Sequence, residues 1–329
     1  MKKTATLAVA VAAFALAVLS SCEKEMLKSG SSDRYVTFEP VLEKALDIYC
    51  GTRSSSLASE DGCMSLPLTC HVTEGIDVAA LDSTKTRGAL CDNAAGLQSI
   101  GTFTTQGYYA DGTAGSVVTV NYNGSSKWVG TPRVMWKEGM KEFYAYANFP
   151  SSGCTITNLL SERKFSYTVP TNVYDQKDIL TGYYKGNEKS DNGTAKIKFT
   201  HPLTAVIFKL GTVYFTPGEL SDGHEIKSIT LRNVYSGGDC TISYDNDKAT
   251  YSWTSTGSQN VTMSSSPSTD SETKIIGEPF LILPQNTSEQ NVTIELVADV
   301  EGRIEVYRTT VNAIYWKEGN TYTYTIAIL

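Results

Sequence analysis

The side chains that most often catalyse reactions are sparse in this sequence. Its three histidines, His71, His201 and His224, stand in no spacing that matches a catalytic motif. The sequence also lacks GxSxG, HExxH, GxxxxGK and a GxGxxG that follows a strand. His201 precedes Pro202 between two predicted strands, a position that favours a structural role over a ligand role. We therefore predict that the protein is not an enzyme and requires no cofactor.

Two kinds of residue in the sequence could in principle bind a metal ion, an Asp-Asn-Asp segment and the cysteines. Asp245-Asn246-Asp247 offers the oxygen ligands that calcium prefers, but no acidic residue follows at the spacing of an EF-hand loop. The same three residues suit a tight turn, because Asx side chains hydrogen-bond to their own backbone. The cysteines include no CxxC pair, which would indicate zinc. The pattern favours a hairpin turn at 245–247 and predicts no metal site.

The N-terminus predicts export and lipidation. After two lysines, residues 5–19 are almost entirely apolar, a run too short to span a bilayer comfortably but typical of a secretory signal. The Leu-Ser-Ser-Cys sequence that ends at Cys22 resembles a bacterial lipobox, in which this cysteine is acylated, for example with palmitate. The alternative is an ordinary cleaved signal with an incidental cysteine. We expect a signal peptide over 1–21, a tether over 22–34 and a lipid anchor in the outer membrane.

The remaining cysteines leave two alternatives open. In an oxidising compartment six cysteines allow fifteen disulfide pairings, and buried free thiols are equally consistent with their irregular spacing. These six are Cys50, Cys63, Cys70, Cys91, Cys154 and Cys240.

Length and charge narrow the functional classes. The 329 residues suffice for two domains, and a content of 41% hydrophobic and 19% charged residues excludes a multi-span membrane protein. The formal net charge is −7, and the sequence contains no run of basic residues of the kind that binds nucleic acid. Because such a surface repels phosphate backbones, nucleic acid is excluded as a partner.

Short alternating polar and apolar runs, separated by turn residues, dominate most of the chain. Residues 292–296 and 303–307 read as two strands, with Asp299–Gly302 as their hairpin connection. Tyr244–Tyr251 is a second hairpin signal, whereas Pro40–Tyr49 has the spacing of a short helix. Many short strands with frequent turns predict an all-β protein built from β-sandwiches.

A short sequence repeat indicates two similar domains. Trp136-Lys-Glu-Gly139 and Trp316-Lys-Glu-Gly319 each precede a strand whose apolar residues fall two apart. The polar run at 185–193 is the expected joint. We predict a first β-sandwich domain over residues 35–190 and a second over residues 191–329.

Nine segments, in this order, carry a wider resemblance over nearly the whole mature chain: Arg34–Glu39, Leu66–Gly75, Thr86–Gly88, Ile100–Tyr109, Trp136–Pro150, Asp178–Leu180, Phe199–Val206, Gly277–Gln285 and Trp316–Leu329. In this order they resemble the fimbrillin family of Bacteroides-type bacteria, which comprises FimA-like and Mfa-like pilins and their lipoprotein relatives.

The resemblance implies two tandem transthyretin-like β-sandwich domains and a role in fimbriae or adhesion at the cell surface. Its implied partners are other fimbrial subunits, together with host or bacterial surface ligands that the sequence does not identify. In family members that polymerise, an arginine-specific protease releases an early strand, and a strand of a neighbouring subunit fills the groove. A sandwich without one strand exposes apolar side chains and unpaired backbone groups, and an added strand satisfies both.

Two arginines are candidate processing sites, Arg87 before Gly-Ala-Leu and Arg53 before three serines. An ordinary solvated loop is the alternative for both. Ser83, in an Asp-Ser-Thr sequence, resembles the O-glycosylation pattern of such bacteria. The last predicted strand, Asn320–Leu329, leaves no further segment to donate, which favours an accessory, tip or anchor subunit over a stalk subunit.

A glycan-binding surface lipoprotein is the second functional hypothesis. It requires an exposed, coplanar aromatic platform on which sugars stack, and Trp128 and Trp253 are the candidates.

Overall fold

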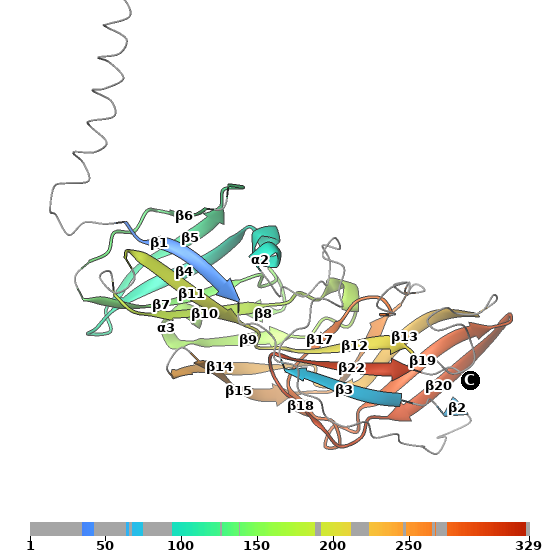
Figure 1. The fold of residues 1–329 in the computed structure, drawn as a ribbon. Helices are drawn as coiled ribbons and strands as arrows, with labels where there is room; N and C mark the ends of the chain where they lie inside the picture. Colours follow the sequence, from blue (N-terminus) through green and yellow to red (C-terminus); the bar gives the residue numbers. More distant parts are fainter. Residues whose placement is uncertain are drawn as a thin grey trace, which may run out of the picture.

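The computed structural model shows an all-β protein with two lobes (Figure 1). It describes residues 35–42, 64–65, 68–74, 94–125, 127–137, 139–187, 192–211, 224–245, 248–264, 267 and 275–326. None of the helices among these residues has the length and apolar character needed to cross a lipid bilayer. The predicted all-β class is confirmed, whereas the transthyretin-like topology stays a prediction.

The N-terminal lobe is a seven-stranded sheet that closes on itself around one hydrophobic core. Three neighbouring aromatic rings, Phe38, Phe103 and Phe143, lie in this core. A short helix, α2 (Ala94–Ile100), contributes the buried Leu97. Around the sheet the strands are β1 (Thr37–Leu42), β11 (Thr194–Thr200), β10 (Leu180–Lys185), β7 (Met140–Ala147), β4 (Thr102–Tyr109), β5 (Ala114–Tyr122) and β6 (Trp128–Thr131).

The C-terminal lobe contains two larger sheets that share one hydrophobic core. The first sheet has the order β17 (Phe280–Ile282), β12 (Thr204–Leu210), β22 (Asn320–Ile326) and β3 (Leu68–Glu74). The second has the order β16 (Gln259–Met263), β13 (His224–Val234), β19 (Thr293–Val300), β20 (Arg303–Thr310) and β2 (Met64–Ser65).

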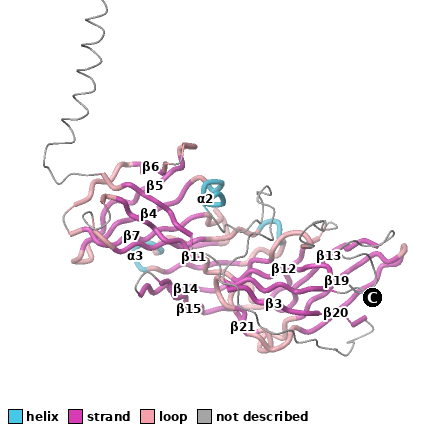
Figure 2. The backbone as a smooth tube through the Cα atoms, in the orientation of Figure 1, coloured by secondary structure: helices cyan, strands magenta, loops and turns pink. Residues whose placement is uncertain are grey.

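A further sheet lies beside both lobes, below the N-terminal lobe in Figure 1. Its order is β15 (Lys248–Thr256), β14 (Gly237–Asp245), β9 (Lys164–Thr168) and β8 (Cys154–Thr155). The remaining described elements are short: α3 (Leu159–Glu162), η1 (Val173–Asp175), β18 (Gln285–Asn286) and β21 (Tyr315–Trp316). Figure 2 labels α3 and β21 on the backbone tube.

Both predicted hairpins are confirmed by strand pairing. β19 and β20 pair from Thr293↔Thr310 to Val300↔Arg303, and the two residues between them, Glu301 and Gly302, have φ values of 52° and 82°. Two consecutive positive φ angles characterise a type I′ turn, whose twist matches that of the flanking strands. The second hairpin joins β14 to β15 and ends at the pair Asp245↔Lys248.

The two Trp-Lys-Glu-Gly segments have the same local structure. Trp136 and Trp316 are both buried, and Gly139 and Gly319 adopt positive φ angles of 85° and 66° just before β7 and β22. A side chain at either glycine would be strained in this left-handed conformation. The indole N–H groups differ in their acceptors, since that of Trp136 donates to the carbonyl of Gly193 and that of Trp316 to the hydroxyl of Tyr324.

The predicted helix at Pro40–Tyr49 is wrong where the structure describes it. Residues 40–42 continue strand β1, which pairs with β11 through Leu42↔Phe199. The inward side chain of Phe38 and this neighbouring strand override the local helical spacing. Residues 43–49 lie outside the described residues.

Strand pairing connects the two halves of the chain more closely than a linear division suggests. The division at residue 190/191 stays a prediction, but β11, which follows it, pairs with β10 and β1 in the N-terminal lobe. Conversely, β9 precedes the division and pairs with β14. Strand β3 pairs with β22 along seven residues, from Glu74↔Asn320 to Leu68↔Ile326.

The connection from β11 to β12 is buried and tied to its surroundings. Its residues His201, Pro202 and Leu203 are all buried. The Nδ1 atom of His201 lies 2.9 Å from Oδ1 of Asp178, and the indole of Trp253 donates to the carbonyl of Pro202. A connection held in this way cannot act as a flexible linker.

Hydrogen bonds between hydroxyl groups form a second connection at the same junction. The hydroxyl of Tyr251, on β15, lies 2.6 Å from the hydroxyls of both Thr181 and Thr200, on β10 and β11. Nearby, the rings of Tyr183 and Tyr244 stack with centroids 4.4 Å apart. These contacts join the sheet of β14 and β15 to the N-terminal lobe.

We expect Tyr251→Phe to lower the free energy of unfolding by about 1–2 kcal/mol, because it removes a hydrogen-bond partner from the fully buried Thr181 hydroxyl. Urea unfolding followed by tryptophan fluorescence measures this change. Tyr315→Phe is the control, since the Tyr315 side chain is 52% exposed, and its effect should stay within about 0.5 kcal/mol. Equal effects of the two substitutions would contradict the role of the junction.

Candidate functional site

Strand β1 is held unequally by its two neighbours. It pairs in parallel with β11 along six residues, from Thr37↔Thr194 to Leu42↔Phe199. On its other side it pairs with β6 only at Phe38↔Trp128. Pro40 has no N–H group to donate. The closed sheet therefore has its weakest seam between β1 and β6.

One aromatic side chain anchors β1 to the core. Phe38 is 3% exposed, and its ring makes edge-to-face contacts with Phe103 and Phe143 at centroid distances of 6.2 and 5.8 Å. Gly130 on β6 provides the space for this ring, because a Cβ atom there would come within 3.1 Å of Phe38 Cε2. The two flanking residues on β1, Thr37 and Glu39, are exposed.

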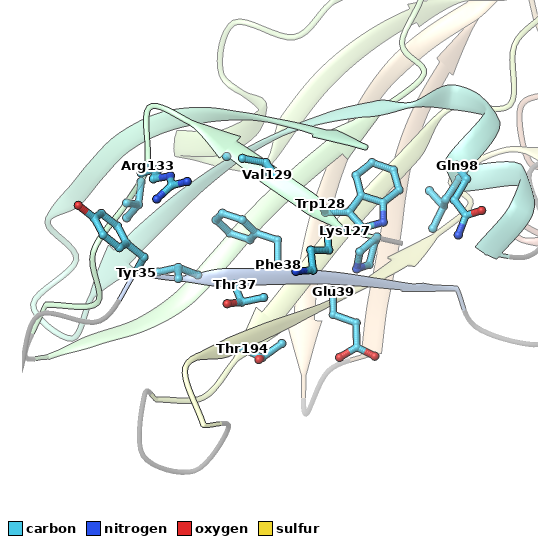
Figure 3. Close-up of a pocket in the computed structure, with 15 residues that line it drawn as sticks. Tyr35, Thr37, Phe38, Glu39, Gln98, Lys127, Trp128, Val129, Arg133 and Thr194 are labelled. Carbon is cyan, nitrogen blue, oxygen red and sulfur yellow. The ribbon is translucent and has the colours of Figure 1, made fainter. Parts of the chain in front are cut away.

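A groove of about 670 Å³ follows the seam (Figure 3). β1 forms one wall, β6 and the following residues form the other, and Gln98 of α2 lies at one end. The guanidinium of Arg133 sits 5.5 Å from the centroid of the Tyr35 ring, a cation–π contact across the groove. Lys127 also lines the groove, so its walls combine aromatic rings with two cationic side chains.

The backbone groups and the apolar pocket beside β1 are both satisfied by this strand. Without β1, the edges of β11 and β6 would expose unpaired N–H and C=O groups, and the pocket of Phe38 would be open. An extended segment with an apolar side chain at the position of Phe38 would satisfy both requirements. No group of His, Cys, Asp and Glu side chains suited to a metal ion occurs among the described residues.

The early part of the chain also covers edges in the C-terminal lobe. β3 is the last strand beside β22, and β2 pairs with β20 at Met64↔Tyr307 and Ser65↔Arg308. All three described strands that precede α2 therefore pair with strands much later in the sequence.

The predicted site residues Cys22, Arg53, Ser83 and Arg87 lie outside the described residues. Their order along the chain relates them to the described strands. Cys22 precedes β1, Arg53 falls between β1 and β2, and Ser83 and Arg87 fall between β3 and α2. Sequence reasoning did not single out Phe38, although Val36 and Phe38 are apolar positions two apart, a weak strand signal.

Two of the six remaining cysteines have described side chains, and both are free thiols. Burial raises the pKa of Cys154 to about 12 and that of Cys240 still further. Such thiols stay protonated and unreactive at neutral pH. The side chains of Cys50, Cys63, Cys70 and Cys91 lie outside the described part, so their state stays a prediction.

The two candidate tryptophans each pack against neighbouring aromatic rings. Trp128 is half-buried, and its ring is tilted by 46° against both Phe103 and Tyr122. Trp253 is also half-buried and meets Phe165 edge to face at 86°. Both rings therefore pack against other aromatic side chains while staying partly exposed, and the glycan-binding alternative stays a prediction.

The histidines contribute no catalytic arrangement in the described part. His201 is buried beside Asp178 at the junction of the lobes, which agrees with its predicted structural role. His71 lies on β3 and His224 begins β13, but their side chains are not described. Asp245 ends β14 as the predicted turn requires, and Asn246 and Asp247 lie outside the described residues.

Comparison with known proteins identifies a family match. The model of the fimbrillin-like family matches residues 85–329, which is most of the chain. No curated protein sequence matches the chain significantly.

Several solved structures are similar to this chain at low sequence identity. A candidate cell adhesion protein from Bacteroides ovatus ATCC 8483 superposes with a TM-score of 0.50 at 12% identity, over 90% of this chain and 93% of that chain. A candidate cell adhesion protein from Bacteroides uniformis ATCC 8492 gives 0.46 at 16% identity, over 69% and 86%. A fimbrial protein from Bacteroides vulgatus ATCC 8482 gives 0.39 at 17% identity, over 69% and 88%.

We expect Phe38→Ala to free β1 from the N-terminal lobe. Loss of a buried phenylalanine side chain costs about 3–5 kcal/mol, so the amides of Thr37–Leu42 should exchange with deuterium more than about 100-fold faster. Hydrogen exchange followed by mass spectrometry measures this rate. Val41→Ala is the control, because Val41 is 40% exposed on the same strand. Unchanged exchange in the Phe38 variant would show that the ring does not anchor β1.

Proposed function

The chain belongs to the fimbrillin-like family, and from this membership we propose that it is a fimbrial subunit that assembles by donor-strand exchange. The family consists of structural adhesion subunits, so the chain is not an enzyme, its partners include other fimbrial subunits, and it works at the cell surface. In the proposed assembly, β1 leaves its place and an extended segment of a neighbouring subunit enters it. The observation that carries this proposal is the one-sided attachment of β1, which has a ladder to β11, one residue pair with β6 and one fully buried side chain, Phe38.

The energetics of β1 support its exchange. Burial of the Phe38 side chain contributes about 1.5–3 kcal/mol, and one salt bridge on this strand, between Glu39 and Lys196, spans 3.9 Å between exposed side chains. Such exposed ion pairs contribute at most about 1 kcal/mol. An incoming strand would match the contacts of β1 with an aromatic side chain at the position of Phe38, an apolar side chain at that of Leu42 and the ladder to β11.

Arginine-specific cleavage is the proposed trigger, and the two candidate arginines have different consequences. A cut after Arg53 separates only β1 from the rest of the chain, because β2 and β3 follow this residue. A cut after Arg87 separates all three strands and so would also uncover β22 and β20 in the C-terminal lobe. We propose that the chain is cleaved after one of these two arginines. The number of strands that are separated, one or three, distinguishes the two sites.

The proposed lipid anchor is coupled to the same event. Acylation of Cys22 would hold the chain at the outer membrane, with the tether leading directly to β1 at Thr37. Because Cys22 precedes both arginines, either cut separates the lipid from the lobes. A subunit that is never cut would remain anchored, which is the property of an anchor or accessory subunit. Ser83 stays a proposed O-glycosylation site.

Treatment of the full chain with an arginine-specific protease should yield a stable core that begins at Ser54 or Gly88, followed by higher oligomers in native mass spectrometry. Arg53→Lys and Arg87→Lys are matched controls, because they keep the charge and remove the cleavage site. One of them should block both the cut and the oligomers. A stable cleaved core that stays monomeric at high concentration would argue against strand exchange.

Cys22→Ala should abolish incorporation of labelled palmitate in the native bacterium and shift the uncleaved protein from the membrane fraction to the soluble fraction. Ser21→Ala, one residue earlier, is the control and should leave both properties unchanged. Continued labelling of the Cys22 variant would exclude this residue as the acylation site.

A further inference from the structure

Strand β15 presents an open edge on the surface of the protein. It pairs with β14 along nine consecutive residues, from Gly237↔Thr256 to Asp245↔Lys248, without a register shift. No other described strand pairs with β15. Among the described residues outside the sheet, only Ser236 hydrogen-bonds to the backbone of β15, through a hydroxyl that donates to the carbonyl of Thr256 at the end of the strand. Figure 1 shows β15 as the outermost strand of its sheet.

The usual protections of an edge strand are missing from β15. Proline, bulges and charged residues normally prevent edge-to-edge pairing. β15 contains no proline and no bulge, and its one charged residue, Lys248, is at its start. Two other edges are covered, since the Thr262 N–H of β16 donates to the carbonyl of Thr171 and β20 pairs with β2. An unprotected nine-residue edge is a site for pairing with another strand.

The side chains of β15 are self-complementary. Thr250, Ser252 and Thr254 are exposed on one face, and Tyr251 and Trp253 are half-buried on the other. In an antiparallel pair centred on Ser252, residue numbers of facing residues sum to a constant, so Tyr251 faces Trp253 and Thr250 faces Thr254 of the second strand. Aromatic and threonine pairs are among the cross-strand pairs that stabilise sheets.

We propose that β15 pairs antiparallel with β15 of a second copy of this chain, with the two-fold axis at Ser252. This register uses all nine residues of both strands. Charge sets the orientation, because antiparallel pairing places each Lys248 opposite Thr256, whereas in-register parallel pairing would place the two lysines side by side. The interface is isologous, as in most homodimers.

This contact is separate from the exchange of β1. β15 belongs to another sheet and needs no cleavage to become available. A standard stable interface buries about 1,200–2,000 Å² of surface, and one pair of nine-residue strands buries less than this. We therefore expect the pairing to be weak between free copies. Where many copies are held together, as in a fimbria, each such contact adds to the others through high effective concentration.

Disulfide trapping of the uncleaved chain tests the proposal. Ser252→Cys places two thiols directly opposite each other, with Cβ atoms about 4.5–5.5 Å apart, so mild oxidation should yield a covalent dimer on non-reducing gels. Lys248→Cys is the control at the end of the strand, where the two thiols would be about 27 Å apart and should not react. The wild-type chain reports any dimer formed by the native cysteines.

Charge variants in the Ser252→Cys background test the register. Thr250→Lys with Thr254→Lys places like charges opposite each other and should abolish the dimer, whereas Thr250→Glu with Thr254→Lys places opposite charges there and should retain it. Both pairs lie on the exposed face, and circular dichroism verifies that the fold is intact. The proposal is overturned if Ser252→Cys gives no more dimer than the wild type, if Lys248→Cys dimerises equally, or if the two charge variants behave alike. None of these outcomes depends on arginine cleavage.

Discussion

An unpaired strand edge exposes a row of backbone N–H and C=O groups, and the way in which each edge is covered shapes this fold. In the N-terminal lobe, β1 lies between β11 and β6 and closes the sheet. In the C-terminal lobe, β3 covers β22 and β2 covers part of β20. The first part of the chain thus completes sheets whose other strands come from later segments. Its removal would expose the edges of these later strands.

Strand β1 is attached to its sheet by fewer residue pairs than the central strand β7 of the same sheet. β7 lies between β4 and β10 with antiparallel ladders on both sides, whereas β1 has one parallel ladder and a single residue pair. The junction of the lobes is also firmly held, because Tyr251 bridges two strands of the neighbouring sheet. The attachment of β1 is thus the weaker one, as the proposed strand exchange requires.

Local sequence patterns predicted the features of this fold that are local in origin. The turn at Glu301-Gly302 and the two Trp-Lys-Glu-Gly segments depend on neighbouring residues, and their glycines and alternating strands were visible in the sequence. The pairing of β3 with β22 joins distant parts of the chain and leaves no local signal. The same limit explains the wrong helix at 40–42, since strand β11 determines its conformation. The anchor role of Phe38 depends on the space above Gly130, which the sequence does not reveal.

The excess of tyrosine over phenylalanine, 19 against 10, has a structural explanation at the junction of the lobes. Where two sheets meet outside their main cores, a side chain must both fill apolar space and satisfy polar neighbours. Tyr144 and Tyr183 do both, because their rings pack together at 5.3 Å and their hydroxyls donate to the carboxylate of Glu142. The Tyr108 hydroxyl similarly donates to the carbonyl of Leu160. Phenylalanine would fill the same apolar space but lose these hydrogen bonds, so tyrosine combines packing with hydrogen bonding where the sheets meet.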